Sequence, residues 1–377
     1  MISNTARPFF IQIGQTARFL LHLPANSSNM PSTIPSRRLP AEWEAQSAVQ
    51  LTFPHENSDW ADSLSDVLPC FYQIAETVSR YQDVLIVCPD PEAIASHLPK
   101  QYRHRFQLLN IPSNDTWARD HGGITILENN QPVVLDFMFN GWGLKFPADK
   151  DNLITGAMQQ AGVFNAPVRH GGLVLEGGGI ESDGAGTLLT TAECLLSPNR
   201  NPHLSKAEIE NRLKELFGIQ RVLWLHHGYL AGDDTDSHID TLARFCAPDT
   251  IAYVKCDNPA DEHFEALNRM EAELREFRTF EGQPYRLFPL PWPEAILAPD
   301  GHRLPATYAN FLIINGAVLM PTYRVPQDAE ALRIFQQIFP DRDIIGIDCR
   351  PLILQHGSLH CVTMQYPATV IRSAADQ

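Results

Sequence analysis

Residues 355–365 read Gln-His-Gly-Ser-Leu-His-Cys-Val-Thr-Met-Gln, and they place Cys361 behind a glycine-containing turn and ahead of a β-type segment. A thiol at such a loop-to-strand junction faces a cleft from a fixed backbone, which favours a role as a nucleophile. The alternative is a buried free thiol, the state of most intracellular cysteines. One cysteine alone does not decide between the two, so the decision rests on the rest of the chain.

Composition limits the kinds of protein that this chain can be. Its 377 residues are enough for two domains or for one large α/β domain with a substantial core. No apolar run approaches the roughly 18 residues that a membrane helix needs. The net charge of −15, without a basic stripe, disfavours nucleic acid as a partner and would attract small cations. Solubility alone is the simpler explanation of that charge.

The cysteines indicate a reducing compartment and therefore predict a cytoplasmic protein. Their number is odd, no pair has Cys-x-x-Cys spacing, and none belongs to a metal-ligand cluster, which argues against a disulfide framework. The seven residues are Cys70, Cys88, Cys194, Cys246, Cys256, Cys349 and Cys361.

The first 35 residues differ from the rest of the chain. A short apolar burst at 9–13 is followed by a stretch rich in Ser and Pro at 27–36. The basic, acid-poor composition is similar to that of a targeting segment, but Arg18 interrupts the apolar part and no cleavage site stands out. We therefore expect residues 1–35 to be a disordered extension, or the natural protein to begin near Met30. No low-complexity linker follows, so residues 36–377 are expected to form a single catalytic domain.

Short strands alternate with helices along that domain. Predicted strands cover 47–53, 83–88, 106–111, 123–127, 133–137, 173–175, 187–190, 221–225, 250–255, 285–289, 310–314, 317–320 and 343–347. Predicted helices cover 62–80, 91–98, 151–161, 205–216, 259–276 and 327–339, and Ser205 with Glu208 forms a capping box at the fourth. The pattern predicts a mixed α/β sheet repeated several times. The glycines at 177–179 lack the Lys-Ser/Thr of a phosphate-binding loop.

Two polar segments follow predicted strands. The first, Asn-Asp-Thr-Trp-Ala-Arg-Asp-His-Gly-Gly at 114–123, holds two carboxylates, an indole and a guanidinium within six residues. Trp117 there is either a pocket wall or part of a surface turn. The second segment places Glu176 between an apolar strand and three glycines, which allow a ligand or another backbone to approach closely. A glycine-rich hairpin would give the same pattern.

A third segment, Gly-Asp-Asp-Thr-Asp-Ser-His-Ile-Asp at 232–240, surrounds His238 with four carboxylates. We expect His238 and Asp240 to alternate along a strand-like segment and so to point to the same side. An Asp/His cluster can also hold a divalent ion, although the EF-hand spacing is missing.

A cysteine, a histidine and two or more aspartates together suit substitution at a guanidinium. Carboxylates clamp the planar cation through charge-assisted hydrogen bonds. The thiolate attacks the central carbon, His238 protonates the departing ammonia, and water then attacks the covalent thiouronium. Carboxylates near a thiol disfavour the thiolate, and a bound guanidinium with a protonated histidine would reverse that bias.

The motifs resemble those of the agmatine deiminase and Porphyromonas-type peptidylarginine deiminase family. In order they are Leu-Pro-Ala-Glu-Trp-Glu at 39–44, Asp-Thr-Trp-Ala-Arg-Asp at 115–120, Leu-Glu-Gly-Gly-Gly at 175–179, His-Ile-Asp at 238–240 and Gly-Ser-Leu-His-Cys at 357–361. The resemblance covers the chain from about residue 36 to its end. It implies an α/β fold, a pentein-type α/β propeller. In that fold about five ββαβ-like units stand in pseudo-fivefold symmetry around a central active site.

The resemblance also implies roles for single residues. Cys361 would be the nucleophile and His238 the general acid and base, while Asp120 and Asp240 would hold the guanidinium. The expected substrate contacts are Trp117, Glu176, Asn310, Asp234 for an ammonium tail, and Gly357 in the turn that lets the thiol reach the substrate. His360 would be a scaffold neighbour. No metal and no cofactor is required.

Agmatine is the expected substrate, with N-carbamoylputrescine and ammonia as products. An enzyme that binds free arginine should place an arginine side chain near the pocket to pair with the carboxylate of the substrate. Residues 140–145, after Asp120, offer one lysine and no arginine, which favours agmatine. Ser237 departs from the family, whose typical members have a glycine before the active histidine. The alternatives are deimination of free or peptidyl arginine, amidinotransfer, and a non-catalytic binder of polyamines or metal. The oligomeric state stays open, with a homo-oligomer among the alternatives.

Overall fold

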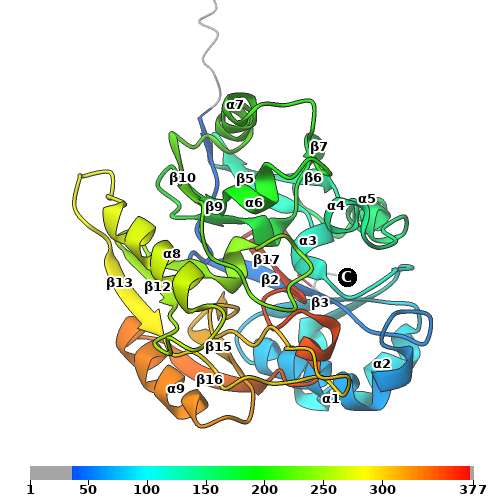
Figure 1. Cartoon of the computed structure of the whole chain (residues 1–377). Helices are drawn as coiled ribbons and strands as arrows, with labels where there is room; N and C mark the ends of the chain where they lie inside the picture. The colour runs from blue at the N-terminus through cyan, green and yellow to red at the C-terminus, as the bar shows by residue number, and fades with distance from the viewer. Residues whose placement is uncertain (1–35, 374–377) are drawn as a thin grey trace, which may run out of the picture. The chain divides into compact units, whose positions relative to one another are not determined.

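Five small sheets contain all the strands of residues 36–373, the part of the chain that the structure, a computed structural model, describes (Figure 1). The expected extension at residues 1–35 lies outside the described residues. The strands are β1 (Arg37–Arg38), β2 (Gln46–Thr52), β3 (Asp83–Cys88), β4 (Phe106–Asn110), β5 (Ile124–Glu128), β6 (Gln131–Met138), β7 (Val168–Val174), β8 (Ile180–Ser182), β9 (Thr187–Thr191), β10 (Arg221–Leu225), β11 (Ala243–Ala247), β12 (Thr250–Val254), β13 (Arg286–Leu290), β14 (Leu312–Ile314), β15 (Ala317–Thr322), β16 (Asp343–Asp348) and β17 (Thr363–Pro367).

The helices connect these strands. They are α1 (Leu64–Ser79), α2 (Pro91–His97), α3 (Ala118–His121), α4 (Gly141–Leu144), α5 (Ile154–Gln160), α6 (Ala192–Leu195), α7 (Lys206–Phe217), α8 (Phe264–Glu276) and α9 (Gln327–Ile338). Short 3₁₀ helices are η1 (Ala61–Ser63), η2 (Lys100–Arg105), η3 (Asp151–Leu153), η4 (Gly177–Gly179), η5 (Ile239–Thr241) and η6 (Leu352–Gln355). None of the helices within residues 36–373 has the length and apolar character needed to cross a bilayer.

The sheets share one arrangement of strand neighbours. In four sheets an antiparallel pair comes first, and its second strand runs parallel to a third strand that is reached through helical segments. β11, β12, α8 and β13 are one example, and β14, β15, α9 and β16 are another. In the fifth sheet β2 has the same two kinds of neighbour, but its antiparallel partner, β17, comes last in the chain. Parallel neighbours require such a crossover, because a tight turn joins only antiparallel strands. The sheet orders are β1-β5-β6-β7, β10-β9-β8, β11-β12-β13, β14-β15-β16 and β17-β2-β3-β4. The expected α/β fold with repeated rounds is confirmed.

The last of these sheets joins the two ends of the described chain. β17 pairs antiparallel with β2, so that Thr363 lies opposite Leu51. On its other edge β2 runs parallel to β3. In Figure 1, β17 (red) lies next to β2 (blue) near the middle of the view. Because Cys361 comes two residues before β17, this pairing fixes the backbone that presents its thiol.

Helical spacing and capping explain where the longer helices form. On α1, Val67, Phe71, Ile74 and Val78 share one face and are buried. Each fully buried side chain of this size contributes roughly 1.5–3 kcal/mol of transfer free energy. On α7, the Ser205 side chain accepts from the Glu208 backbone N–H while the Glu208 side chain accepts from the Ser205 backbone, so the predicted capping box is confirmed.

Three local expectations differ from the structure. The sequence pattern misses β8, because this short strand lies in a run rich in glycine and acid, and it misses β11, because Arg244 interrupts its apolar residues. The strand-like segment expected for 238–240 is wrong. The backbone N–H groups of Thr241 and Leu242 bond back to the carbonyls of His238 and Ile239, which closes η5.

Candidate active site

A cavity of about 150 Å³ contains five of the residues expected at the site. Trp117, Asp120, Asp234, Gly357 and Cys361 all line it. The other lining residues are Asp59, Asp115, Trp142, Phe146, Thr235, Gln355 and His356. No lysine or arginine of residues 36–373 belongs to this lining, whereas four aspartates do. The cavity therefore suits a small cation.

Cys361 is held from two sides. Its backbone N–H donates to Asn310 Oδ1 over 3.2 Å, and its thiol lies 3.4 Å from the same oxygen. Its carbonyl accepts from the Arg119 N–H over 3.1 Å, which ties the cysteine to α3. Burial, together with Asp240 and Asp120, raises the pKa of the Cys361 thiol well above its usual value. Before a cation binds, the thiol is consequently protonated.

Asp120, on α3, faces this thiol with both carboxylate oxygens held. Oδ1 accepts from the Gly178 N–H over 3.0 Å and Oδ2 from Trp142 Nε1 over 2.9 Å. Burial raises the pKa of Asp120 to about 6, against the opposing effect of His238. The carboxylate is thus ionised at neutral pH, as a clamp for a guanidinium requires.

Trp142 was not predicted, and its placement depends on unusual backbone angles. All four residues of α4 have positive φ: Gly141 at 66°, Trp142 at 54°, Gly143 at 85° and Leu144 at 68°. The left-handed region costs an L-residue roughly 1–2 kcal/mol. This turn directs the Trp142 indole to Asp120. The paired glycines at 141 and 143 were the available sequence signal.

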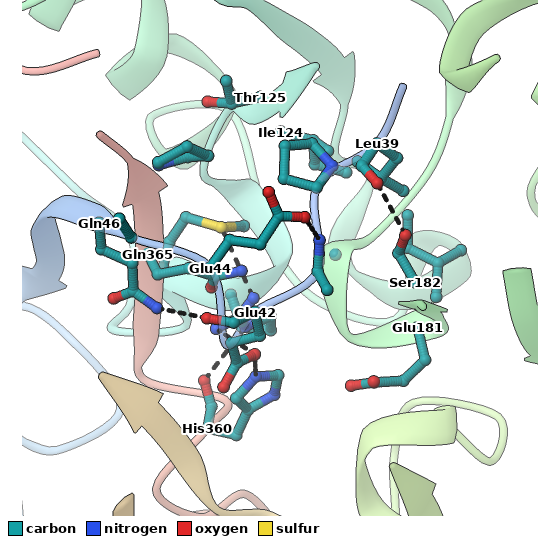
Figure 2. Close-up of a pocket in the computed structure, with 18 residues that line it drawn as sticks. Leu39, Glu42, Glu44, Gln46, Ile124, Thr125, Glu181, Ser182, His360 and Gln365 are labelled. Carbon is teal, nitrogen blue, oxygen red and sulfur yellow. Dashed lines mark hydrogen bonds and ion pairs between the residues drawn. The ribbon is translucent and has the colours of Figure 1, made fainter. Parts of the chain in front are cut away.

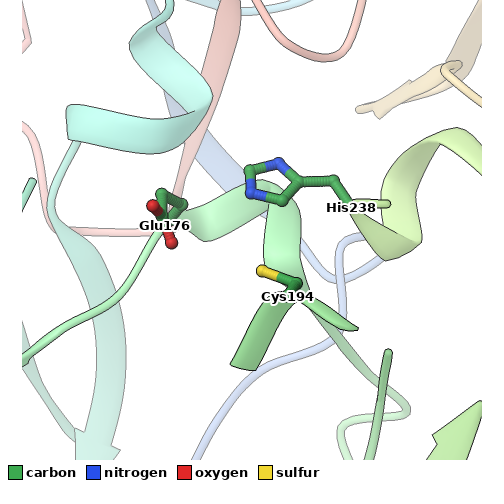
Figure 3. Close-up of side chains that lie close together, drawn as sticks. All are labelled: Glu176, Cys194 and His238. Carbon is green, nitrogen blue, oxygen red and sulfur yellow. The ribbon is translucent and has the colours of Figure 1, made fainter. Parts of the chain in front are cut away.

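His238 is fully buried next to Asp120. Its Nδ1 lies 3.6 Å from Asp120 Oδ1, and neither ring nitrogen has a hydrogen-bond partner within the described residues. Burial alone would lower the pKa of His238, but Asp120, Cys194 and Glu176 outweigh it and raise the pKa to about 10. Figure 3 shows the ring pointing toward Glu176 and Cys194. The histidine therefore carries a proton that it can donate.

Asp240 and His238 do not line the cavity, but both converge with Asp120 on one point next to Gly178, even though the segment is not a strand. A Cβ atom on Gly178 would lie 2.6 Å from His238 Nδ1, 2.8 Å from Asp120 Oδ1 and 3.2 Å from Asp240 Oδ1. Asp240 Oδ1 is buried and has no hydrogen-bond partner among residues 36–373. Only glycine leaves this space open, and a guanidinium N–H would satisfy the free oxygen.

Ser237 occupies the position where the sequence departs from the family. Asp236 and Ser237 have φ of 64° and 62°, a conformation that glycine adopts without steric cost. Ser237 is held there because its backbone N–H donates to Asp233 Oδ2 over 2.7 Å and its hydroxyl donates to Glu193 over 3.0 Å. The missing glycine is thus compensated by local hydrogen bonds.

Two expected substrate contacts lie outside the cavity lining. Glu176 is fully buried, and Arg200 Nε lies 2.9 Å from each of its carboxylate oxygens. Arg200 also donates to Asp236 Oδ2 over 2.6 Å, so it joins Glu176 to the loop before His238. Asn310 is likewise fully buried and accepts from Cys361 instead of facing the cavity. Both side chains support the residues around the cavity.

Two groups of side chains have donor atoms within 4.8 Å of one another, as a metal site would require. One is Glu176, Cys194 and His238, and the other is Glu42, Glu181 and His360. In the first group Arg200 already binds the carboxylate of Glu176. In the second group Arg244 binds both glutamates. A divalent cation at either place would have to displace a buried guanidinium.

Several lining residues were missed from the sequence. Asp115 accepts from Trp60 Nε1 over 2.9 Å, and burial raises the pKa of Asp115 to about 6. His356 Nδ1 lies 2.7 Å from the Gly232 carbonyl and 3.9 Å from Asp234. Asp115 belongs to the polar segment 114–123 and His356 to the stretch 355–365 around Cys361, so their position in those motifs was the signal.

Comparison with known proteins gives one consistent family. The profile of Porphyromonas-type peptidyl-arginine deiminases matches residues 38–367. An agmatine deiminase of Stutzerimonas stutzeri is 31% identical over 357 residues, 89% of this chain and 96% of that protein. The structure of an agmatine deiminase of C. jejuni with substrate bound is 36% identical, with a TM-score of 0.83, and the match covers 90% of this chain and 98% of that one. A Porphyromonas gingivalis structure, provisionally named an arginine deiminase, is 55% identical with a TM-score of 0.86, covering 89% and 100%.

Proposed function

The chain belongs to the Porphyromonas-type peptidyl-arginine deiminase family, and from that membership and the geometry of its cavity we propose that it is an agmatine deiminase. It hydrolyses the guanidinium of agmatine to give N-carbamoylputrescine and ammonia. The observation that carries this proposal is the charge of the lining, which combines Cys361 with four aspartates and no lysine or arginine of the described residues.

Carboxylates in and next to the lining match both ends of agmatine. Asp120, which lines the cavity, and Asp240, which lies beside it near Gly178, hold the guanidinium through charge-assisted hydrogen bonds. Toward the solvent, Asp59 and Asp234 are available to the ammonium tail, because both are exposed or partly exposed and both line the cavity. The carboxylate of free arginine would have no cationic partner in this lining, and an unpaired charge that loses water is unfavourable.

Binding of the substrate prepares the nucleophile. The cation neutralises Asp120 and Asp240, the carboxylates that raise the pKa of the Cys361 thiol, so the thiol proton leaves to solvent. The thiolate then forms an S–C bond to the guanidinium carbon. His238 gives its proton to one amino group, the C–N bond breaks, and ammonia departs from a covalent thiouronium.

Hydrolysis of the thiouronium restores the site. His238, now neutral, takes a proton from water as the oxygen attacks the same carbon. The C–S bond breaks, the electron pair returns to sulfur as thiolate, and the ureido product loses its hydroxyl proton to solvent. Trp117 and Trp142 shape the cavity around the carbon chain. Glu176 and Asn310 act through other residues: Glu176 helps to raise the pKa of His238, and Asn310 holds the backbone of Cys361. The scheme uses no metal and no cofactor.

We extend the proposal to the arrangement of the fold and to the compartment. The α/β pentein fold would place its five sheets in pseudo-fivefold symmetry around the site, so that residues 36–377 form one catalytic domain. In support, three lining residues lie in segments that connect two different sheets: Asp120 between β4 and β5, Asp234 between β10 and β11, and Cys361 between β16 and β17. All seven cysteines are free and buried, which fits a reducing cytoplasm.

The test is a substrate panel of agmatine, free arginine and an arginyl peptide, with ammonia and the ureido product measured for each. Agmatine should react with the highest kcat/KM, and Cys361→Ala should lose turnover by on the order of 10³-fold or more. Exhaustive chelation should leave the rate unchanged. No turnover of any guanidine would contradict the enzyme, and ureido product from the peptide alone would replace agmatine by peptidyl arginine.

Peptidyl arginine is the second candidate because the family profile that matches the chain is named for peptidyl-arginine deiminases. A peptide would need room beyond a cavity of about 150 Å³, and it would bring backbone carbonyls to a rim of carboxylates. An amidinotransferase would form its product, a new guanidine, only when an acceptor amine is added to the same assay. A non-catalytic polyamine or metal binder would show binding without ammonia.

A further inference from the structure

We propose that His360, directly before the nucleophile, is a positioning residue that holds one oxygen of Asp240 so that the other faces the substrate. The inference rests on the proposed function and names a residue through which that site recognises its cation. His360 is 1% exposed and does not line the substrate cavity, so it acts on the substrate only through Asp240.

The His360 ring lies between two carboxylates. Its Nδ1 lies 2.8 Å from Asp240 Oδ2, and its Nε2 lies 2.7 Å from Glu42 Oε2. Both are hydrogen-bond distances for a charge-assisted pair. Figure 2 shows His360 with its bond to Glu42 in a second cavity, of about 60 Å³, which opens among residues 39–46. The ring therefore links the segment before β2 to the active site.

The arrangement assigns different tasks to the two oxygens of Asp240. Oδ2 is occupied by His360, whereas Oδ1 is buried without a hydrogen-bond partner among the described residues. Oδ1 is also the oxygen that lies near Gly178, beside Asp120 Oδ1 and His238 Nδ1. Because a carboxylate bound through one oxygen cannot rotate freely, His360 keeps Oδ1 directed at the guanidinium position.

His360 also affects the charge of Asp240. Burial by itself would raise the pKa of Asp240, but the hydrogen bond from His360, together with the nearby positive groups of His238 and Arg244, outweighs it and lowers the pKa. An ionised Asp240 beside an equally buried Asp120 is unfavourable without such a partner. His360 thus keeps the second carboxylate of the clamp ionised before any substrate arrives.

The charged groups around His360 come from every element packed against it. Glu42 precedes β2, Arg119 lies on α3, Glu181 on β8, Asp240 on η5 and Arg244 on β11. Burial, then Arg119 and Arg244, lower the pKa of His360, while Glu42 and Asp240 oppose that effect. Glu42, His360 and Asp240 share their protons and respond to pH as one unit.

Backbone contacts fix the ring in this place. The His360 N–H donates to Asn310 Oδ1 over 2.8 Å, and the same oxygen accepts from the Cys361 N–H. Asn310 Nδ2 in turn donates to the Asp240 carbonyl over 3.2 Å. Asn310 thus holds Cys361, His360 and the η5 segment together. A shift of the His360 ring would therefore displace both Asp240 and Cys361.

The experiment compares His360→Asn with His360→Gln. The Asn amide nitrogen reaches the place of Nδ1 and can still donate to Asp240, whereas the Gln amide reaches the place of Nε2 and Glu42. Agmatine affinity is measured by calorimetry from pH 5 to 9 in a Cys361→Ala background, and kcat/KM is measured over the same range in the active protein. The matched control is His263→Gln, since His263 is also buried beside an aspartate, Asp261 Oδ1 at 2.7 Å, and does not line the cavity.

His360→Gln removes the bond that keeps the pKa of Asp240 low against burial, so we expect the pH at which agmatine affinity is half lost to move upward past the wild-type value, which Asp120 sets. At pH 7 we expect a rise in KM of roughly tenfold with a smaller change in kcat, because Oδ1 of Asp240 is no longer held toward the guanidinium. His360→Asn should stay close to the wild-type profile, and His263→Gln should change thermal stability without moving the profile.

The outcomes separate this inference from the proposed function. If the wild type turns over no guanidine but the Cys361→Ala protein binds agmatine with the His360-dependent profile, the inference stands and the enzyme assignment falls. If agmatine is turned over and Asn and Gln at 360 behave alike, His360 does not position Asp240. If agmatine is neither bound nor turned over, both proposals are overturned. A variant that fails to fold is replaced by Asn310→Ser, which should shift the same profile by releasing the η5 segment.

Discussion

At the scale of single residues, the proposed nucleophile stays inactive until the substrate is present. Cys361 faces Asp120 and Asp240, and burial with these two charges raises the pKa of its thiol. A protonated buried thiol is a poor nucleophile and also a poor target for oxidants. The arriving guanidinium removes the electrostatic penalty, so reactivity and recognition depend on the same two carboxylates.

The acid side of the pH profile follows from Asp120. The pKa of this carboxyl is raised to about 6, and the protonated form can no longer clamp a cation. We therefore expect kcat/KM for agmatine to rise as the pH passes upward through about 6. Initial rates in buffers of constant ionic strength test this.

Titration of the substrate cannot produce this acid limb of the pH profile. A guanidinium stays charged far above this range, so the titrating group belongs to the protein. A profile that is flat between pH 5 and 7 would contradict an ionised Asp120 as the clamp. His238, whose pKa is raised to about 10, should keep the alkaline side flat up to that pH.

At the scale of elements, glycines decide how closely the loops approach the reacting carbon. η4 places Gly178 where a methyl group would lie 2.6 Å from His238 Nδ1. We expect Gly178→Ala to lower kcat/KM by on the order of 100-fold, because displacing a catalytic group by about 1 Å has that effect. Steady-state kinetics with agmatine measure it.

Gly156 is the matched control for that substitution. It lies inside α5, and a Cβ there meets nothing within 4 Å. Gly156→Ala should leave kcat/KM unchanged and stabilise the protein by about 0.5–1 kcal/mol, since alanine favours the helix. Equal losses of activity in both alanine variants would mean that the effect at Gly178 is not steric.

The cap of α7 gives a prediction about stability alone. Ser205 accepts from the Glu208 N–H at the first turn, far from the cavity. Ser205→Ala should lower the free energy of unfolding by about 1 kcal/mol, and Ser205→Gly by only a few tenths. Urea unfolding monitored by tryptophan fluorescence compares the two, and an equal loss would rule out the cap as the cause. Activity should not change.

The elements also show what sequence patterns can and cannot predict. β3 and β10 were predicted with their observed bounds, because short apolar runs between turn residues read directly as buried strands. Cys361, Asp120 and His238 were predicted as site residues because each lies in a motif that is continuous in sequence. Trp142 and the support role of Asn310 were not, since one depends on positive φ and the other on a partner 51 residues away.

At the scale of the whole described unit, Arg244 connects several sheets. From β11 it binds Glu181 of β8, Glu42 before β2 over 2.8 Å, and the Phe311 carbonyl before β14 over 2.7 Å. Its side chain is fully buried. Removing one member of such a network leaves charges buried without a partner, which typically costs about 3–5 kcal/mol.

We accordingly expect Arg244→Met to lower the free energy of unfolding by about 3–5 kcal/mol. Arg269→Met is the control, because its pair with Glu265 is exposed on α8 and such pairs contribute about 0.3–0.5 kcal/mol. Urea unfolding at pH 7 measures both. A loss below about 1 kcal/mol for Arg244→Met would show that the sheets do not depend on this network.

The pairing of β17 with β2 has a consequence for synthesis on the ribosome. β2 is made early, and its partner emerges only after all the other strands of residues 36–373. Until then one edge of a buried apolar strand has no neighbour, which is the kind of surface that recruits other chains. The nucleophile arrives in the same last segment. Translation that stops early therefore yields a product that is both prone to aggregate and chemically inert, whereas a released full-length chain gains its closed sheet and its reactive thiol in one step.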